Sequence, residues 1–318
     1  MSFTAINLNI MEIIRGLHNL RAEHRGNVVT IGNFDGVHLG HQAIIKQLKI
    51  QAAEHNVPAT IMTFHPNPQE FFAPDTAPAK LTQFRDKMKL LEQYGVDRVI
   101  CVRFNRDLAN LSAVDFIQRI LIDGLHAQHL VIGDDFRFGK NRVGDFALLK
   151  AKGEELGFDV ESTPTYCLDN DRVSSTRIRN VLSTGDMALT KRLLGRTFHV
   201  SGIVAHGDKR GRTIGFPTAN IRLKQQIAPT NGVYAVKITG LEKNYFGVAN
   251  IGVRPTVGGN RYLLETHIFD FEQDIYNQRL QINFQHFIRP EQRFDGLDAL
   301  VAQIKLDTET AKALFLKP

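Results

Sequence analysis

The sequence contains no tryptophan and only two cysteines among its 318 residues. Cys101 and Cys167 match no metal or redox spacing, so we expect two reduced thiols in a cytoplasmic protein. No run of about 18 apolar residues is present, which argues against a transmembrane helix. The first ten residues carry no Lys or Arg and do not resemble a secretion signal.

The net charge is +6, which suits either nucleic acid or small polyphosphate substrates. Dense Lys/Arg runs are missing from the sequence, and there is no tryptophan on which a base could stack. We therefore expect small-molecule substrates, with no nucleic acid, no membrane and no obligate protein partner.

Short apolar runs alternate with amphipathic segments in the first half of the chain. The apolar runs predict buried strands at 27–33, 59–64, 98–104, 129–133 and 158–166. Helical spacing between them predicts helices at 39–55, 83–95, 113–125 and 145–156. This order is typical of a doubly wound parallel sheet, which binds ligands beyond the carboxyl ends of its strands.

The pattern changes after about residue 185. A helix that ends at Gly195 leads into six short strand-like runs, and the tail from Gly296 is helical. Six such strands predict a small closed antiparallel barrel. We expect an α/β domain over residues 1–186, followed by a barrel domain with C-terminal helices over 187–318.

The first expected strand ends in GNFDGVHLGH, residues 32–41, where a helix begins. Glycines relax the backbone there, and the N-terminus of the helix favours an anion. His38 and His41 share a helix face, and their imidazoles can donate to charge that grows on a phosphate. The residues alone leave two alternatives open, a zinc site and histidines that only cap the turn.

Three further segments each follow an expected strand. They are MTFHPNP at 62–68, GDDFRFG at 133–139 and DRVSSTRIRN at 171–180. Hydroxyls beside arginine at the start of a helix, as in the third segment, can hold an anion, although an ordinary helix cap is the alternative. All of these segments can line one crevice at the carboxyl edge of the sheet.

GxFDGVHxGH, the FxPxP segment, the GxDFRFG loop and SSTxxR together resemble the adenylyltransferase domain of bacterial bifunctional riboflavin kinase/FMN adenylyltransferases. That domain is similar to the HxGH nucleotidyltransferases. The resemblance implies that the phosphate of FMN attacks the α-phosphate of ATP and expels pyrophosphate. It further implies catalytic roles for His38, His41 and Arg179, ATP binding by Gly32, Phe34, Asp35, Gly36, Ser175 and Thr176, and flavin contacts for His65, Asn67, Asp135, Phe136 and Phe138.

A glycine-rich basic segment occurs at 207–223, GDKRGRTIGFPTANIRL. Gly207, Gly211 and Gly215 recur every four residues with Lys and Arg between them, a composition that can wrap phosphates. A solvated hairpin tip is the alternative. Thr218 and Asn220 offer neutral oxygens that suit Mg²⁺.

Glu265 lies inside an expected strand. By alternation it shares a face with Leu263 and His267. If that face is interior, a carboxylate there needs a partner or a task, and accepting a proton from an alcohol is one such task. A glutamate that faces outward is the alternative.

GRxxGFPTAN, GVYAV, VANIGVRPTV and LETHIFDF resemble, in this order, the riboflavin kinase domain of the same family. The resemblance implies ATP-dependent phosphorylation of the riboflavin 5′-hydroxyl, with Glu265 as the base and Thr218 and Asn220 binding Mg²⁺ with ATP. We expect the remaining contacts to ATP from Gly207, Gly211, Arg212 and Gly215, and contacts to the flavin from Arg289 and Glu291.

We therefore expect a bifunctional enzyme that makes FMN from riboflavin and then FAD from FMN, with ATP as co-substrate and Mg²⁺. Two alternatives remain from the sequence. One is an adenylyltransferase for another substrate with a regulatory barrel, and the other is a basic RNA- or flavin-binding regulator.

The opening MxxxRG of the family matches MEIIRG at Met11, so residues 1–10 resemble an extension. We predict that their deletion preserves both activities, because none of the motifs lies in this segment. Formation of FMN and FAD by the truncated and full-length proteins tests this expectation, and loss of either activity contradicts it.

Overall fold

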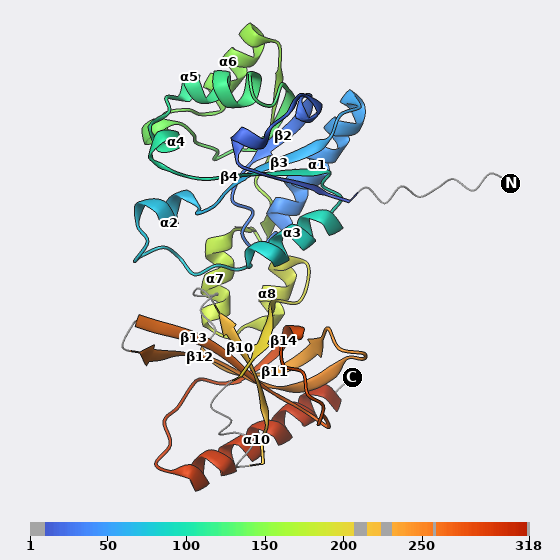
Figure 1. Cartoon of the computed structure of the whole chain (residues 1–318), viewed down its shortest axis with the longest axis vertical. Helices are drawn as coiled ribbons and strands as arrows, with labels where there is room; N and C mark the ends of the chain where they lie inside the picture. The colour runs from blue at the N-terminus through green and yellow to red at the C-terminus, as the bar shows by residue number, and fades with distance from the viewer. Residues whose placement is uncertain (1–9, 207–214, 224–230, 257–258, 317–318) are drawn as a thin grey trace, which may run out of the picture. The chain divides into compact units, whose positions relative to one another are not determined.

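The structure is a computed structural model that describes residues 10–206, 215–223, 231–256 and 259–316 (Figure 1). The chain divides into two compact units, Met1–Pro78 with Lys87–Val173, and Ala79–Asp86 with Ser174–Pro318. The boundary that the sequence suggests after residue 186 stays a prediction.

Six parallel strands form the sheet of the first unit, in the order β1-β4-β3-β2-β5-β6. They are β1 (Glu12–Arg15), β2 (Asn27–Ile31), β3 (Ala59–Phe64), β4 (Arg98–Val102), β5 (Ala127–Gly133) and β6 (Asp159–Thr163). The predicted parallel sheet is confirmed. The sequence analysis missed β1, because this edge strand has only four residues and three of them are exposed.

Helices cover both faces of this sheet. The helices of this unit are α1 (Leu39–His55), α2 (Pro68–Phe72), α3 (Phe84–Gln93), α4 (Arg106–Asn110), α5 (Ala113–Phe116), the π-helical η3 (Ile117–Ile122) and α6 (Phe146–Leu156). Val29 and Ile31 of β2 pack into a core with α5, η3 and α6. Val28 and Thr30 are equally buried on the other face, where α1 contacts β2 and β5. Burial of both faces explains why these strands read as continuous apolar runs.

Shorter elements complete the first unit. They are the 3-10 helices η1 (Leu17–Asn19), η2 (Ala22–His24) and η4 (Lys140–Arg142), and the paired strands β7 (Cys167–Leu168) and β8 (Asp171–Arg172). Helix starts follow their capping residues, as in Asn67 before α2, Ser112 before α5 and Asp145 before α6.

The second unit is a closed antiparallel barrel with the strand order β10-β13-β12-β11-β14-β9. Its strands are β9 (His199–Ala205), β10 (Thr218–Leu223), β11 (Gly232–Thr239), β12 (Tyr245–Thr256), β13 (Gly259–Ile268) and β14 (Arg279–Arg289). Helices α7 (Ser175–Ser183) and α8 (Met187–Leu194) precede it, and α10 (Leu297–Leu316) follows it. The predicted six-stranded barrel is confirmed.

Aromatic side chains fill the barrel. The ring centroid of Phe284 lies 5.1 Å from that of Tyr234 and 5.5 Å from that of Phe198, and all three residues are almost fully buried. Burial raises the pKa of the Tyr234 phenol, which therefore stays protonated. Outside the barrel, Ala311 of α10 packs against Ala235 and Phe269. The barrel interior is thus a packed core, and α10 covers part of its outer surface.

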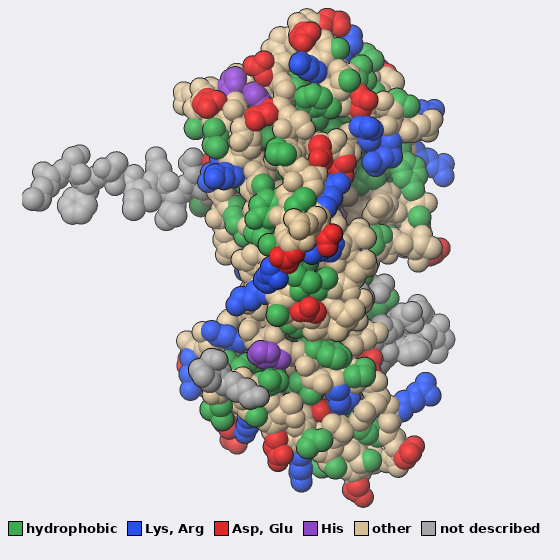
Figure 2. Space-filling model, turned by 180° about the vertical axis from the view of Figure 1, so that it is seen from behind, with side chains coloured by type: hydrophobic (Ala, Val, Ile, Leu, Met, Phe, Trp, Pro, Cys, Tyr) green, Lys and Arg blue, Asp and Glu red, His purple; other side chains and the backbone are tan. Residues whose placement is uncertain are grey.

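Charged side chains of both signs are scattered over the face in Figure 2. On this face the positive side chains are interspersed with negative ones and do not form the continuous basic stripe that is typical of nucleic-acid binding. Among the described residues, no helix is both long enough and apolar enough to cross a bilayer.

The two cysteines differ in environment. Burial raises the pKa of the Cys101 thiol on β4, although Lys87 and Arg15 partly oppose this effect, whereas Cys167 is exposed. A raised pKa lowers the thiolate fraction, so we predict that Cys101 reacts at least about tenfold more slowly than Cys167 with a thiol-specific reagent near pH 8. The single variants Cys101→Ser and Cys167→Ser separate the two rates, and equal rates would contradict the prediction.

Candidate functional site

The turn between β2 and α1 has an unusual backbone. Gly36 has φ 86°, and Phe34 and Val37 have φ 49° and 40°, in the left-handed region. This region is unfavourable for a β-branched residue such as valine, and strained backbone of this kind clusters at ligand sites. A Cβ at Gly40 would lie 3.2 Å from the His38 ring and 3.3 Å from the Val173 carbonyl oxygen. The glycines therefore allow a tight turn at the end of β2.

His38 is the N-cap of α1. Its Nδ1 accepts a hydrogen bond from the backbone N–H of His41 at 3.3 Å, and the residue is 5% exposed. The two imidazole rings stack with centroids 3.7 Å apart and an interplanar angle of 17°. Because Nδ1 accepts, the proton of the neutral His38 ring sits on Nε2. Nδ1 of His38 therefore caps the helix, and Nε2 remains as a hydrogen-bond donor.

Lys87 of α3 brings a cation to the same edge of the sheet. Its Nζ donates to the Asn33 carbonyl oxygen at 2.9 Å and to Thr63 Oγ1 at 3.1 Å. The sequence analysis did not single out Lys87, because a lysine on an amphipathic helix gives no signal of this position. Among the described residues, no third ligand joins His38 and His41 in a cluster that could hold a metal.

A cavity of about 1170 Å³ lies in the first unit. Its aromatic lining residues are Phe64, Phe71, Phe72, Phe104, Phe116, Phe136 and Phe138. Phe136 stacks on Phe138 with centroids 5.5 Å apart and an interplanar angle of 16°. The sequence analysis named only these last two as site residues. Phe64 opens the FxPxP segment but was not singled out, and the others lie on α2, on α5 or just after β4, outside the motifs.

Three predicted flavin contacts have other positions. His65, Asn67 and Asp135 are not among the residues that line this cavity. Asn67 caps α2 by accepting from the Glu70 N–H at 2.9 Å, and Asp135 pairs with Arg172 at 2.5 Å. Their contact with a flavin stays a prediction.

Ser175, Thr176 and Arg179 belong to the second unit, on α7. Ser174 is the N-cap of this helix and accepts from the Arg177 N–H at 3.2 Å. The Arg179 Nε donates to the Ala79 carbonyl oxygen at 2.5 Å. The predicted cap is therefore present, and the binding of ATP phosphates by these residues stays a prediction.

A row of polar residues crosses three strands of the barrel. Glu265 of β13 is the register partner of Asn220 on β10 and of Asn250 on β12. Two residues further along, Thr218 opposes His267, whose Nδ1 donates to the Pro217 carbonyl oxygen at 2.9 Å. Directly opposed residues project from the same face of a sheet, so this row concentrates polar groups on one patch.

Glu265 does not face the barrel interior. Leu264, Thr266 and Ile268 alternate with it and are buried inside, whereas Glu265 is half-buried on the outer face. Of the two alternatives that the sequence left open, the structure therefore has the outward-facing glutamate. Glu265 lines a cavity of about 370 Å³ on the outside of the barrel. A half-buried carboxylate on the wall of a cavity is more typical of a functional residue than of an ordinary surface glutamate.

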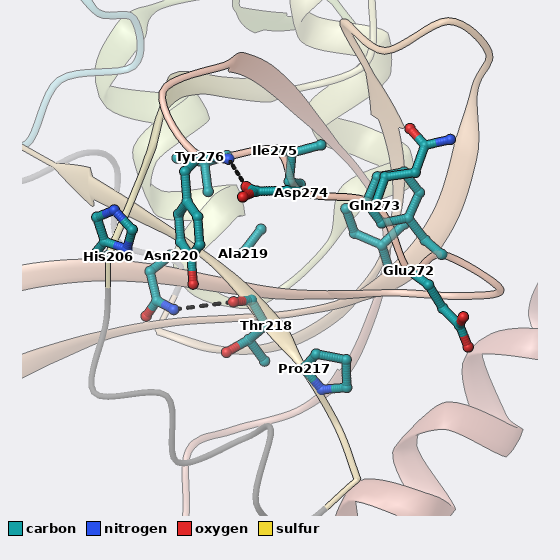
Figure 3. A pocket seen from close by; sticks show the side chains of 13 residues that line it. His206, Pro217, Thr218, Ala219, Asn220, Glu272, Gln273, Asp274, Ile275 and Tyr276 are labelled. Atoms are coloured by element: carbon teal, nitrogen blue, oxygen red, sulfur yellow. Dashed lines mark hydrogen bonds between the residues drawn. The ribbon is translucent and has the colours of Figure 1, made fainter.

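Two cavities meet at Thr218. The first, about 560 Å³, is lined by Thr218, Asn220, His206 and the segment that ends at Tyr276 (Figure 3). The second, about 370 Å³, is lined by Thr218, Glu265, His267, Arg289 and Glu291, together with residues of α10. Thr218 therefore lines both cavities, and Glu265 lines the second.

Arg289 and Glu291 line the second cavity, but Arg289 also makes a strong internal ion pair. Its guanidinium donates to both carboxylate oxygens of Asp307 on α10, at 2.8–3.1 Å. Asn250 Nδ2 donates to Glu291 at 3.4 Å. Gly215 has φ 84°. The predicted phosphate-binding residues Gly207, Gly211 and Arg212 lie outside the described residues.

Comparison with known proteins matches each unit to a family. The FAD synthetase family matches residues 20–177, and the riboflavin kinase family matches residues 194–315. The chain is 50% identical over 307 residues to a bifunctional riboflavin kinase/FMN adenylyltransferase of Escherichia coli K12, covering 96% of this chain and 98% of the relative. A Pseudomonas fluorescens protein with the same name is 51% identical over 305 residues, with the same coverage.

A solved structure is similar over nearly the whole chain. It is the crystal structure of a macrolide-efflux protein from Streptococcus pneumoniae, which is 30% identical, with a TM-score of 0.81. The similarity covers 95% of this chain and 99% of that one. Both units therefore occur together, in this order, in a related protein.

The ion pair between Arg289 and Asp307 gives a prediction about stability. Asp307 is 3% exposed, so Asp307→Ala leaves a guanidinium without its carboxylate. We expect a loss of about 2 kcal/mol in the free energy of unfolding of the second unit, less than for a fully buried pair because Arg289 keeps some contact with solvent. Urea unfolding followed by circular dichroism measures the loss.

Glu309→Ala, on an exposed face of the same helix, is the matched control. It should change the free energy of unfolding by no more than about 0.5 kcal/mol. Equal stability of the Asp307→Ala and Glu309→Ala proteins would show that the ion pair contributes nothing.

Proposed function

The chain belongs to the family of bifunctional riboflavin kinase/FMN adenylyltransferases, and on this premise we propose how its two units divide the work. The barrel unit phosphorylates riboflavin to FMN, and the α/β unit transfers the adenylyl group of ATP to FMN. The observation that carries most weight is that Thr218 lines two cavities, the second of which is also lined by Glu265.

In the α/β unit, a phosphate oxygen of FMN attacks the α-phosphorus of ATP. The new O–P bond forms as the bond from the α-phosphorus to the bridging oxygen breaks, and pyrophosphate leaves. The attacking oxygen is already anionic, so no side chain has to act as a nucleophile, and the protein contributes position and charge stabilisation.

The turn at the start of α1 suits this task. Nε2 of His38 is the protonated nitrogen of the ring, because Nδ1 accepts from the backbone. The first N–H groups of α1 and the ammonium of Lys87 add positive potential at the same edge. We assign ATP phosphates to this turn, with His41, Gly32, Phe34, Asp35 and Gly36. A role for Ser175, Thr176 and Arg179 of the second unit in binding ATP phosphates is a separate proposal, which rests on their match to SSTxxR alone.

The aromatic cavity of the α/β unit suits the flavin ring. Its volume of about 1170 Å³ exceeds what one drug-sized ligand needs, and its phenylalanines offer faces and edges to a planar heterocycle. We assign the isoalloxazine of FMN to the neighbourhood of Phe136 and Phe138, with Phe71, Phe72 and Phe104 as additional walls.

In the barrel unit, the 5′-hydroxyl of riboflavin attacks the γ-phosphorus of ATP. The carboxylate of Glu265 accepts the hydroxyl proton, and the new O–P bond forms as the bond from the γ-phosphorus to the β,γ-bridging oxygen breaks, so that ADP leaves. We assign ATP to the cavity of Thr218 and Asn220 and riboflavin to the cavity of Glu265, so that the transferred phosphoryl group passes Thr218.

Thr218 and Asn220 have oxygens that fit a magnesium ion bound to ATP. The Asn220 Nδ2 donates to the Thr218 carbonyl oxygen at 3.2 Å, which orients the amide so that Oδ1 remains an acceptor (Figure 3). When bound, Mg²⁺ neutralises charge that develops on the phosphates. The two side chains would hold the ion together with phosphate oxygens.

Two substitutions should separate the activities. Glu265→Gln should abolish FMN formation from riboflavin and leave FAD formation from added FMN near normal. His38→Asn should leave FMN formation normal and lower the rate of FAD formation by about 10²–10³-fold, because the imidazole donor is lost. Asparagine is itself a good N-cap, so this variant keeps the start of α1. Chromatography of FMN and FAD after incubation with ATP and Mg²⁺ measures both rates.

Glu242→Gln and His18→Asn, at exposed positions of the two units, are the matched controls and should keep both activities. Parallel loss of both activities in Glu265→Gln would contradict separate sites. Normal FAD formation by His38→Asn would show that His38 only caps helix α1 and does not contribute to adenylyl transfer.

A further inference from the structure

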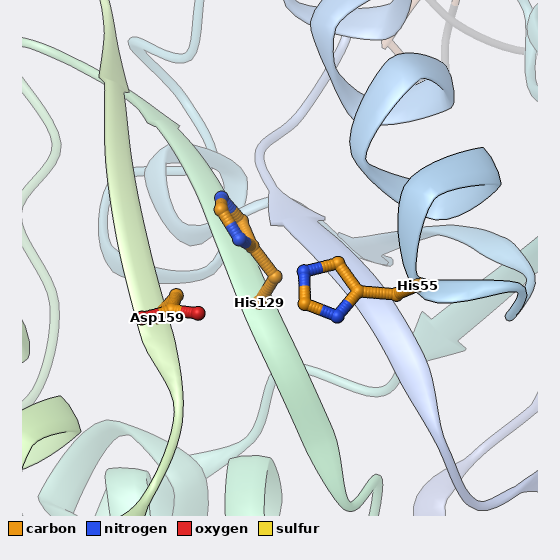
Figure 4. Close-up of side chains that lie close together, drawn as sticks. All are labelled: His55, His129 and Asp159. Atoms are coloured by element: carbon orange, nitrogen blue, oxygen red, sulfur yellow. The ribbon is translucent and has the colours of Figure 1, made fainter.

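Three titratable side chains meet at the edge of the parallel sheet that lies far from the phosphate turn. His55 is the last residue of α1, His129 lies on β5, and Asp159 is the first residue of β6. One ligand atom from each lies within 4.8 Å of the others (Figure 4). No motif in the sequence and none of the functions proposed above uses these residues.

The topology explains why they meet. His129 and Asp159 are register partners on adjacent parallel strands, so their side chains project from the same face of the sheet. Helix α1 packs against both strands and ends at His55, which reaches the amino ends of the strands. The 17 residues of α1 span about 25 Å, which separates His55 from the turn at His38.

His129 is the residue that needs an explanation. It is 7% exposed, and neither of its ring nitrogens has a hydrogen-bond partner among the described residues. A buried polar group without a partner is costly, and such groups in native proteins often mark an ion or a water.

A second carboxylate stands next to the cluster. Glu161 lies two residues after Asp159 on the same face of β6, and its Oε2 is 3.6 Å from the Nε2 of His129. Gln47 of α1 donates to both carboxylate oxygens of Glu161, at 2.9 and 3.0 Å. This contact holds the carboxylate in place in the manner of the outer partners of metal ligands.

We propose that His55, His129 and Asp159 bind a zinc ion, with Glu161 as the fourth ligand. Two neutral imidazoles and two carboxylates match the ligand preference of Zn²⁺ and balance its charge. Ligand atoms of a tetrahedral zinc ion lie about 3.3 Å apart. The ligand atoms of His55, His129 and Asp159 lie within 4.8 Å of one another, so these three side chains must close by at most about 1.5 Å. Asp159 is exposed and His55 is half-buried, and rotation of these two side chains supplies the movement.

The ion has a structural role. It connects the end of α1 to β5 and β6 on the side of the sheet away from the adenylyl transfer. Binding to the folded protein raises the thermal midpoint of unfolding, and the rise grows with the affinity.

Cobalt is the probe, because tetrahedral Co²⁺ with imidazole ligands absorbs intensely in the visible range and hydrated Co²⁺ does not. The full-length protein, without a polyhistidine tag and freed of metal by chelator, is titrated with Co²⁺. We expect one equivalent to give the tetrahedral spectrum and Zn²⁺ to displace it. His55→Gln, Asp159→Asn and Glu161→Gln should each weaken binding at least about tenfold.

His126→Gln is the matched control, because this exposed histidine lies three residues before His129 and outside the cluster. It should bind Co²⁺ like the wild type and should keep the rise in thermal midpoint with Zn²⁺, which His55→Gln should lose. Circular dichroism of the metal-free variants verifies that they fold. A purely hydrated spectrum, or equal affinities for all five proteins, would overturn the proposal.

Discussion

The filled interior of the barrel is the constraint on which the kinase site depends. Tyr234, Phe198 and Phe284 occupy the space that a ligand would need, so binding can take place only outside the ring of strands. A single strand then serves two purposes. Leu264, Thr266 and Ile268 of β13 hold the core together, and the alternate Glu265 and His267 face the outer cavities. Residues of helix α10 line part of the same outer cavity as Thr218 and Glu265.

The α/β unit meets an equivalent constraint in another way. Helices cover both faces of its sheet, so polar chemistry is confined to the two edges where strands begin and end. At the carboxyl edge, the tight turn after β2 presents the start of α1, and Lys87 adds a cation. At the amino edge, the end of α1 brings His55 to His129 and Asp159. In our two proposals, one helix therefore binds an anion at its first turn and a cation at its last.

Much of the architecture could be predicted from the sequence, because strands buried on both faces and alternating barrel strands leave clear periodic patterns. The start of α1 at Leu39 and the C-cap of α8 at Gly195 follow from local capping and were predicted closely. The edge strand β1 was missed, because four residues with exposed charges carry too little pattern.

The sites were predictable to the extent that they follow motifs. Thr218, Glu265, Arg289 and Glu291 come from three separate segments, and the structure brings them to one cavity. The pairing of Arg289 with Asp307 and the contacts of Lys87 could not be predicted, since each depends on the packing of a helix against strands that are distant in sequence. Most of the phenylalanine cavity was missed for another reason. A single aromatic residue in the sequence cannot be distinguished from an ordinary core residue.

The position of Thr218 has an energetic consequence for ligand binding. In our assignment of ATP and riboflavin to these cavities, Thr218 lies beside both ligands, so any shift that the nucleotide imposes on it alters the free energy with which riboflavin binds. Thermodynamic reciprocity requires the same factor in the opposite direction. The proposed arrangement thus implies cooperativity between the two ligands that needs neither a second subunit nor a distant effector.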